Sequence, residues 1–229
     1  AAVAAARLLR CVPIMREPLR QLSSPTVSPR SVTNGWRTSL LNPDRIVSSE
    51  AEELILVDEE DRETGYSSKA DCHDGEGRLH RAFSVFLFNA GGELLIQQRA
   101  DGKRLWPGFW SNTCCSHPRR GETIELASER RLADELNIST ELEFVYKFIY
   151  RASFGEAGSE YEYCHVFIGH VNGDPRANVN EIAAIRFVSP AALEAEFAGD
   201  PGRFTPWFKL EWEALRTKYR DALGRYAEL

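Results

Sequence analysis

The 229-residue sequence lacks several features that mark membrane-embedded, secreted or zinc-finger proteins. It has no apolar run near the eighteen or so residues that a membrane-spanning helix needs, so we expect no membrane partner. Its five cysteines are an odd number without regular spacing, which argues against a secreted disulfide framework and favours a reducing compartment. No Cys-x-x-Cys pair is present, which argues against a structural zinc finger.

Acidic residues are almost absent from the first forty positions, although the chain has a formal net charge of -6. Residues 1–40 hold six arginines and one glutamate, a composition typical of an organelle transit peptide or a disordered tail. The acidic remainder argues against a nucleic-acid partner. We expect a basic extension over residues 1–48 and a folded domain over residues 49–229. The location would be cytoplasmic or, with a transit peptide, a plastid or mitochondrion.

Strand-like and helix-like segments follow one another after residue 48, which predicts a mixed α/β fold in one compact domain. The NAGGE turn predicts a hairpin between two of the strands. Thr123 and Asn137 suit the two ends of a helix, and Ser189-Pro190 suits a helix start. The predicted strands cover residues 53–58, 81–89, 94–99, 143–151, 161–170 and 184–188, and the helices residues 122–136, 190 onward and 207–226.

The stretch from Trp106 to Pro118, WPGFWSNTCCSHP, gathers two tryptophans, a Pro-Gly turn, two adjacent cysteines and a histidine. A buried turn with inert thiols would explain one such cysteine and one such histidine. The whole combination indicates a functional site, because exposed thiols and unpartnered aromatic side chains are costly to keep together in a loop.

Three histidines and two glutamates form a candidate metal-binding set. Glu160 and Glu162 stand two apart on a predicted strand, so their side chains point to one face. Mixed imidazole and carboxylate ligands suit a five- or six-coordinate divalent metal. A single histidine would more simply be a hydrogen-bonded polar residue, the role expected of His165 and His170. The candidate ligands are His73, His80, His117, Glu160 and Glu162.

The helix predicted over residues 122–136 carries charges at spacings that resemble the Nudix box, G-x5-E-x7-R-E-U-x-E-E-x-G-U. A Nudix hydrolase uses the glutamates of this box to hold metal ions that activate a diphosphate for attack by water. Arg131 replaces one of these glutamates and can pair with Glu135. We therefore expect a scaffold that holds a diphosphate through one Mg²⁺ on Glu135 but hydrolyses it poorly. The alternative is a solvated charged helix face. Matching positions are Glu122, Arg130, Asp134 and Glu135, and departures are Ser116, Arg131 and Asn137.

Basic and acid–base residues complete the candidate site. Arginine offers phosphate a forked donor and lysine a point charge, so basic residues on the flanking loops and helix are candidate anion ligands. A cysteine thiol and a carboxylate can work on opposite faces of a substrate carbon, and Trp110 and Trp207 can offer a π face to a cation. The basic candidates are Lys69, Arg99, Lys103 and Arg131.

Together these stretches resemble the type I isopentenyl-diphosphate isomerases. The resemblance covers roughly residues 50–210 in the right order, and it implies a Nudix-like mixed sheet flanked by helices. It also implies conversion of isopentenyl diphosphate to dimethylallyl diphosphate through a tertiary carbocation, in isoprenoid biosynthesis, without an organic cofactor. The matching stretches are KADCH, LHRAFSVFLFN, QQRADGK, WPGFWSNTCCSHP, RRLADEL, YRA, EYEYCHVF and FTPWF.

The resemblance further implies a role for individual residues. The catalytic pair is Cys115 and Glu162, with Tyr150 hydrogen-bonding near Glu162 and Trp207 shielding the cation. A Zn²⁺, Mn²⁺ or Mg²⁺ site maps to the three histidines and two glutamates above. A second ion, Mg²⁺ on the substrate's diphosphate, maps to Glu135 and the Cys115 carbonyl. The other partner is a small-molecule substrate, and we expect a monomer. Diphosphate-contact positions are Lys69, Arg99, Lys103 and Ser116.

Two other functions remain open at this level. A Nudix hydrolase acting on a nucleoside diphosphate derivative is disfavoured by Arg131 and by Cys115, which hydrolysis does not need. A degenerate Nudix module used only for binding is disfavoured by the full set of candidate metal ligands beside a thiol.

Overall fold

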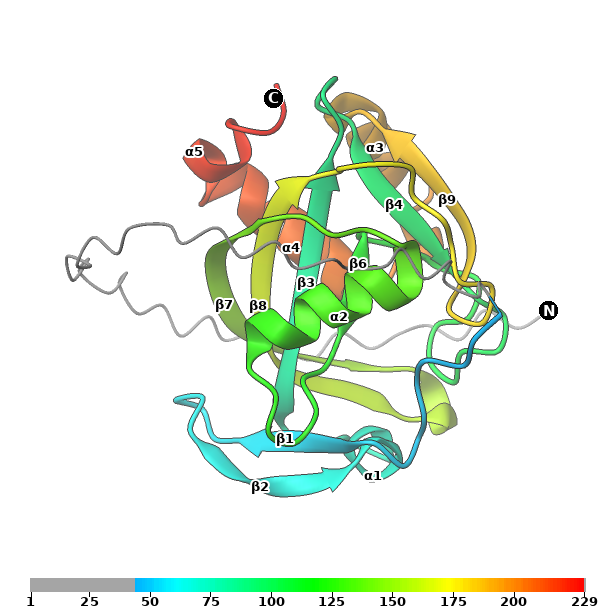
Figure 1. Ribbon diagram of the computed structural model, residues 1–229, viewed down its shortest axis with the longest axis vertical. Coiled ribbons are helices and arrows are strands. Elements are labelled where there is room, and N and C mark those ends of the chain that lie inside the picture. Colours follow the sequence, from blue (N-terminus) through cyan, green and yellow to red (C-terminus); the bar gives the residue numbers. More distant parts are fainter. Residues whose placement is uncertain (1–43, 229) are drawn as a thin grey trace, which may run out of the picture.

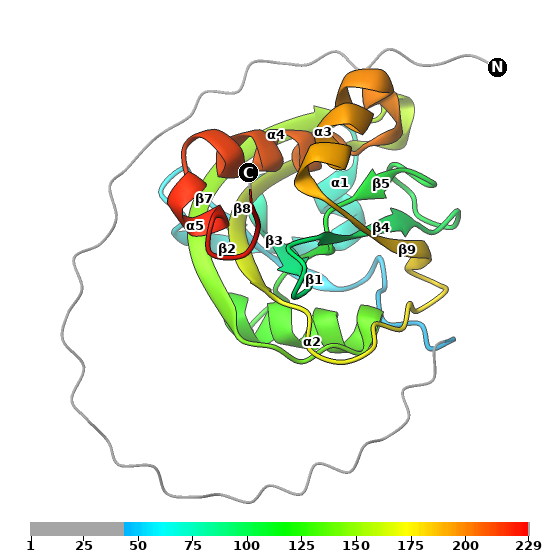
Figure 2. The same ribbon diagram turned by 90° about the horizontal axis from the view of Figure 1, so that it is seen from above.

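The computed structural model describes residues 44–228, which form a mixed nine-stranded sheet with helices on both faces (Figures 1 and 2). Most of the predicted extension thus lies outside the described residues. The strands are β1 (Glu53–Val57), β2 (Glu63–Ser68), β3 (His80–Phe88), β4 (Leu94–Arg99), β5 (Trp110–Ser111), β6 (Cys114–Ser116), β7 (Leu142–Ser153), β8 (Ser159–His170) and β9 (Ile182–Val188). The helices are α1 (Lys69–His73), α2 (Ile124–Leu136), α3 (Pro190–Gly199), α4 (Pro206–Thr217) and α5 (Arg220–Leu223), with 3₁₀ turns at Gly155–Ala157 and Pro201–Arg203.

Strand β3 is the centre of the sheet because its sequence is apolar on both faces. It pairs in parallel with β8 along its whole length and antiparallel with β6, β1 and β4 over shorter stretches. Alternate side chains enter two separate cores. Phe83, Val85 and Leu87 belong to one core, and Ala82, Phe86 and Phe88 belong to the other.

Helix α2 covers one face of the sheet, and helices α3, α4 and α5 cover the other (Figure 2). The hydroxyl of Thr123 caps α2 by accepting from the backbone N–H of Leu126, and Asn137 ends the helix in the left-handed region with φ 58°. Ser189 caps α3 in the same way as Thr123 caps α2. The mixed α/β fold and these helix ends are confirmed.

Two elements form between residues 58 and 81, a stretch for which neither a strand nor a helix was predicted. Strand β2 pairs with β1 over nearly its whole length although its sequence, ETGYSS, has almost no apolar residues. Helix α1 is only five residues long, and it forms because the Ser68 hydroxyl accepts from the backbone N–H of Asp71. Local hydrophobic periodicity could not reveal either element, since neither depends on an apolar stripe.

The prediction of one helix over residues 207–226 is wrong. Helix α4 ends at Thr217, and the chain turns before α5 begins. Tyr219 lies at this turn and stacks on Tyr146 of β7, with ring centroids 4.3 Å apart and planes 5° from parallel. The predicted hairpin between β3 and β4 exists, but its register holds only the pair Phe88 and Leu94, because β6 occupies the same edge of β3 from Phe83 to Val85.

None of the helices in the described part of the chain is long and apolar enough to cross a membrane. Four cysteines lie in this part, and all four are free thiols.

Candidate active site

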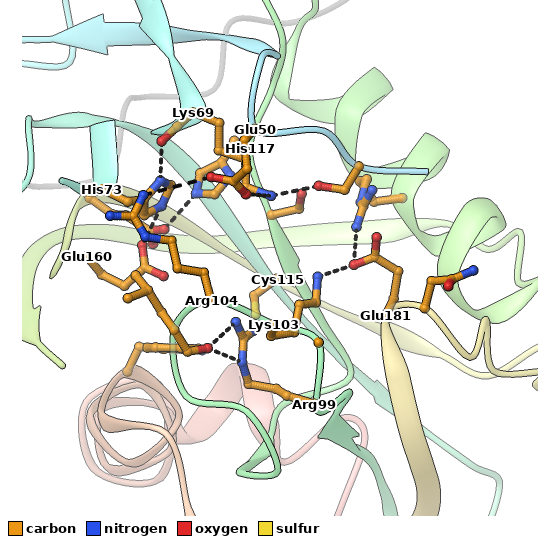
Figure 3. A pocket seen from close by; sticks show the side chains of 18 of the residues that line it. Glu50, Lys69, His73, Arg99, Lys103, Arg104, Cys115, His117, Glu160 and Glu181 are labelled. Carbon is orange, nitrogen blue, oxygen red and sulfur yellow. Dashed lines mark hydrogen bonds and ion pairs between the residues drawn. The ribbon is translucent and has the colours of Figure 1, made fainter. Parts of the chain in front are cut away.

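A cavity of about 290 Å³ lies beside the N-terminal ends of β3 and β8. Figure 3 shows two unlike sides, with His73 and Glu160 on one side and Lys103 and Glu181 on the other. Cys115 lies between them. We call the first side the donor end and the second the cationic end. The donor end comprises His73, His80, His117, Glu160 and Glu162, and the cationic end comprises Lys69, Arg99, Lys103 and Arg131.

The donor end brings together all five candidate metal ligands from four places in the chain. Each offers one ligand atom, and these atoms all lie within 4.8 Å of one another. His73 ends α1, His80 opens β3 and His117 follows β6. The parallel register of β3 and β8 sets His80 beside Glu162. Gly158 lets β8 approach α1 closely, since a Cβ at this position would collide with the His73 carbonyl oxygen.

Backbone carbonyls orient two of the imidazoles. Nδ1 of His73 donates to the Lys69 carbonyl and Nδ1 of His80 to the Arg78 carbonyl, both at 2.7 Å, which leaves Nε2 of each ring facing the cluster. Metal-ligating histidines are commonly held in this way. Nε2 of His80 is buried without a hydrogen-bond partner, and its nearest carboxylate oxygen, on Glu162, is 3.9 Å away. A divalent cation would satisfy this buried donor set, so the residues fit a metal.

The pKa values of three residues at the donor end also favour the binding of a cation. Burial, and the charge of a protonated His73, lower the pKa of His80 to about 4. Burial likewise holds the pKa of His117 well below its ordinary value. Burial acts against ionisation of Glu160, but His73 lies 2.8 Å away and lowers the pKa of that carboxyl to about 2. Neutral imidazoles and ionised carboxylates are the forms that coordinate a metal, so His80, His117 and Glu160 already favour the required form. His73 differs, because Glu160 outweighs burial and raises its pKa, so a metal would have to displace its proton.

Glu162 differs from Glu160 in its surroundings. Burial and the neighbouring charge of Glu160 raise the pKa of Glu162 well above its ordinary value. The Tyr150 hydroxyl donates to its Oε2 at 2.6 Å, and Nε2 of His117 lies 2.9 Å from its Oε1. Two carboxyls that cannot both ionise easily tend to carry one proton between them. Glu162 is therefore a group that can hold and release a proton in this cavity.

The two adjacent cysteines point to opposite faces of the sheet, as an extended segment predicts. Cys114 is fully buried in the core beneath α2, whereas Cys115 lines the cavity. Cys115 pairs in register with Ser84 of β3, which fixes its place. Burial raises the pKa of the Cys115 thiol to about 12, with a smaller opposing effect from Arg99, so the thiol holds its proton at neutral pH.

An aromatic wall faces the thiol and the carboxyl. Trp207, near the start of α4, is buried and lines the cavity, and its indole N–H donates to the Ser111 hydroxyl at 3.1 Å. Trp106 packs edge-on against it at 5.2 Å between ring centroids. Trp110 was expected in this wall, but the structure places it outside the cavity lining. Its ring packs instead under the guanidinium of Arg186 at 4.6 Å.

The cationic end contains the expected basic residues, and several already have oxygen partners. The ammonium of Lys69 donates to the Ser48 hydroxyl at 2.6 Å and lies 3.7 Å from Glu50. Burial and the nearby charge of Lys103 lower the pKa of Lys69. The guanidinium of Arg99 donates to two backbone carbonyls and lies 5.4 Å from the ring of Trp207. Ser116 also lines this part of the cavity.

Arg131 is the most enclosed of these cations. Its Nε donates to Glu135 at 2.8 Å, which confirms the predicted pairing along α2. Its other nitrogens donate to the Val47 carbonyl at 2.9 Å and lie 3.2 Å from Glu181. Glu135 is buried behind Arg131 and is not itself part of the cavity lining.

Sequence reasoning missed several residues that line this cavity, four of them charged or close to its cations. Arg104 had no feature that set it apart from a surface charge. Glu181 has no local signal either, because it precedes a short strand and reaches the cavity only through the pairing of β9 with β4. Ser48 and Glu50 come from the segment before β1, which runs along the cationic end.

Comparison with known proteins identifies relatives of this chain. The NUDIX domain model matches residues 78–208. The chain is 41% identical to "Isopentenyl-diphosphate Delta-isomerase 1" of Photorhabdus laumondii, over 75% of this chain and 99% of that protein. It is 43% identical to "Isopentenyl-diphosphate Delta-isomerase" of Nocardia farcinica, over 74% of this chain and 98% of that protein. The crystal structure of DR0079 from Deinococcus radiodurans has a TM-score of 0.56 and 22% identity, covering 77% of this chain and 100% of that one, which shows a shared fold.

Proposed function

The chain belongs to the isopentenyl-diphosphate Delta-isomerase family of NUDIX-domain proteins, and from that membership we propose that its cavity converts isopentenyl diphosphate into dimethylallyl diphosphate. The observation that carries the proposal is that a protonated thiol, Cys115, and a proton-holding carboxyl, Glu162, line one cavity. Moving a double bond requires one group to add a proton and another to remove one. Both groups are enclosed here between an aromatic wall and a cationic end.

The reaction needs no change in the substrate's composition. Either Cys115 or Glu162 adds a proton to the terminal alkene carbon, which leaves a tertiary carbocation. The other group, which must be ionised at that moment, removes a proton from the methylene next to the cationic carbon, on the opposite side of the molecule. After one turnover the two side chains have exchanged protonation states, so a proton must pass between them or through solvent before the next.

Tyr150 and Trp207 support this step in different ways. Tyr150 donates to Glu162 at 2.6 Å, so it fixes the carboxyl and stabilises its ionised form. Trp207 lines the cavity, and the guanidinium of Arg99 lies over its ring at 5.4 Å, so its π face can favour a nearby cation. The buried wall also keeps water away from the carbocation, which water would otherwise capture as an alcohol.

The donor end would hold a divalent ion, and Zn²⁺, Mn²⁺ and Mg²⁺ all accept its mixed ligands. Such an ion would supply positive charge that offsets the paired carboxylates and makes a proton on Glu162 easier to release. The donors proposed for it are His73, His80, His117, Glu160 and Glu162.

The cationic end would bind the substrate's diphosphate. We propose contacts from Lys69, Arg99, Lys103, Ser116 and Arg131, which line that end of the cavity. Mg²⁺ bound with the diphosphate would be held by Glu135 and the Cys115 carbonyl, and it would offset phosphate charge. Arg131 occupies Glu135 in the free protein, which argues against the cluster of metal ions that a hydrolase of this fold would need.

All of these residues come from one chain, so we propose that a monomer is sufficient for activity. We also propose that residues 49–229 form the isomerase domain, to which the segment over residues 44–48 is bound. Val47 is buried in the structure, and its carbonyl accepts from Arg131.

Incubation with isopentenyl diphosphate and Mg²⁺ in D₂O, followed by NMR, tests the proposal. Deuterated dimethylallyl diphosphate is expected with the wild-type protein and not with Cys115→Ala. Release of phosphate without an allylic product would instead indicate a hydrolase. An unchanged substrate, in a folded and metal-loaded sample, would indicate a binding module.

A further inference from the structure

Glu181 is a buried carboxylate that lines the cationic end, and neither the expected chemistry nor the expected diphosphate contacts make use of it. Its side chain is 4% exposed. The ammonium of Lys103 donates to its Oε2, and a nitrogen of Arg131 lies 3.2 Å from the same oxygen. One carboxylate oxygen is thus shared by two cations that are both proposed to bind the substrate.

The backbone of Glu181 is fixed on both sides. Its N–H donates to the Asn178 carbonyl at 2.9 Å, and its own carbonyl accepts from the N–H of Ala100 at 3.0 Å. The second bond ties Glu181 to the loop that carries Arg99 and Lys103. The carboxylate is therefore a fixed negative charge in the cavity, whereas Lys103 has a flexible stem that can turn toward another anion.

The carboxyl group of Glu181 favours its ionised form in this position. Burial acts to raise the pKa of Glu181, but Lys103 and Arg131 more than offset burial and lower the pKa below its ordinary value. Glu50 is 54% exposed and lies 3.7 Å from Lys69, so water screens its charge far more strongly. Glu135 is buried but lies behind Arg131, outside the cavity lining. Glu181 is therefore the main enclosed anion that lines the cationic end.

A diphosphate bound to Lys103 and Arg131 would lie close to this carboxylate. The two anions would share the same cations and repel one another in a partly enclosed, low-dielectric cavity. We propose that Glu181 is an internal counter-ion that competes with the substrate's diphosphate for Lys103 and Arg131, and so limits how tightly the enzyme holds diphosphates.

This inference rests on the proposed function, and it explains why an enzyme would keep an anion in an anion site. Substrate and product carry the same diphosphate, so its contacts stabilise substrate, transition state and product alike. Binding of this uniform kind lowers KM without raising kcat, and too much of it slows product release. In the free protein the carboxylate also offsets positive charge on Lys103 and Arg131.

The test is the affinity for inorganic pyrophosphate, measured by calorimetry at one Mg²⁺ concentration, in wild type and Glu181→Gln. The amide keeps the shape of the side chain and removes its charge. We expect E181Q to bind pyrophosphate about tenfold more tightly, because the competing charge is gone. We also expect a lower KM for isopentenyl diphosphate. Simple damage to the site would weaken binding, so the sign of the change separates the two explanations.

Asp61→Asn is the matched control. Asp61 is another buried carboxylate with several cationic partners, and it lies outside the cavity lining. Both variants gain one unit of positive charge and lose buried ion pairs, but only E181Q should tighten pyrophosphate binding. Unchanged or weaker binding by E181Q would overturn the proposal, and so would equal tightening in D61N.

A second variant covers the case in which E181Q does not fold. Glu181→Asp keeps the charge but withdraws it by one methylene from Lys103, and we expect a smaller tightening of the same sign. Pyrophosphate has no double bond, so these results do not depend on isomerase activity. Loss of the proposed function would appear in the NMR assay of the wild type, whereas failure of this inference would appear only in the affinities.

Discussion

The donor end and the cationic end of the cavity differ in what each has left unsatisfied. At the donor end, Nε2 of His80 is buried without a hydrogen-bond partner among residues that all offer ligand atoms. At the cationic end, Lys69, Lys103 and Arg131 already have oxygen partners within the protein. In the proposed function, the first end would take up a cation from outside, whereas the second would bind an anion by exchanging partners.

This difference predicts which kinetic constant a substitution at each end of the cavity should change. In the proposed function, groups at the donor end and Cys115 would meet the reacting carbons or hold the groups that do, so changes there should act on kcat and on metal content. Groups at the cationic end would hold a part of the substrate that does not react, so changes there should act on affinity.

The largest effect is expected for substitutions of the two proposed proton carriers, Cys115 and Glu162. Cys115→Ala or Glu162→Gln removes one of the two proton carriers, so kcat in the NMR assay should fall by about 10³-fold or more. Cys114→Ala is the control, because its thiol points away from the cavity into the core beneath α2. It should keep near-normal activity at reduced thermal stability. Substantial turnover by C115A would contradict the assignment of roles.

The next effect concerns the donor end alone. His117→Ala removes one of five converging ligands and should lower metal affinity by about 100-fold, as measured by elemental analysis after dialysis. His170→Ala is the matched variant, since His170 is exposed and lies outside the cluster. Activity should fall in parallel with metal content and partly return when excess metal is added. If H117A remained fully loaded, His117 would not be a ligand.

Local sequence signals correctly predicted the central strand and several helix ends. The apolar sequence of β3 specified a strand buried on both faces, and Thr123, Asn137 and Ser189 marked helix ends that the structure confirms. These features succeed because capping bonds and periodicity act within a few residues of one another. The alternation of side chains also placed Cys114 and Cys115 on opposite faces.

Features that depend on distant pairing were less predictable. The register of β3 with β8 aligns His80 with Glu162 across 82 positions of the chain, and no local pattern encodes that alignment. Trp110 belongs to the same sequence motif as the cavity residue Cys115. Its ring nevertheless packs against the guanidinium of Arg186 in β9 and lies outside the cavity lining. The position of Glu181 at the cavity depends on the pairing of β9 with β4, which brings the start of β9 beside the loop after β4. The candidate ligands were selected because imidazoles and carboxylates are chemically unusual together, and the structure shows that their ligand atoms converge within 4.8 Å. Their individual contacts could not be derived from the sequence.

A smaller effect is expected at the cationic end. Lys103→Ala should raise KM for isopentenyl diphosphate about tenfold and change kcat little, since it removes one charged contact to a part of the substrate that does not react. Lys218→Ala, an exposed lysine at the end of α4, should change neither constant. Steady-state kinetics on both variants gives the answer. A fall in kcat as large as that of C115A would mean that the two ends are not separable.

The smallest effect on activity is expected at a separate charged cluster, whose members bind one another and lie outside the cavity lining. Asp61 accepts from Arg81 and Lys147 at 2.8 Å and lies 2.9 Å from Nε2 of His165. Burial acts against ionisation of Asp61, but hydrogen bonds from these partners hold the pKa of its carboxyl well below the usual range. Asp61 has φ 65°, a conformation that asparagine also tolerates, so Asp61→Asn changes the charge without straining the backbone.

The sign of the pH dependence follows from the lowered pKa. A carboxyl with a lower pKa in the folded state stabilises the protein above its unfolded pKa of about 4, and this contribution is lost as pH falls toward the folded pKa. Asp61→Asn should therefore cost about 2 kcal/mol of unfolding free energy at pH 7, and the difference from wild type should shrink below about pH 4. Thermal unfolding across pH measures this difference, while kcat and KM at pH 7 should stay near wild type. A constant difference at every pH would show that packing, and not the charge of Asp61, holds this cluster together.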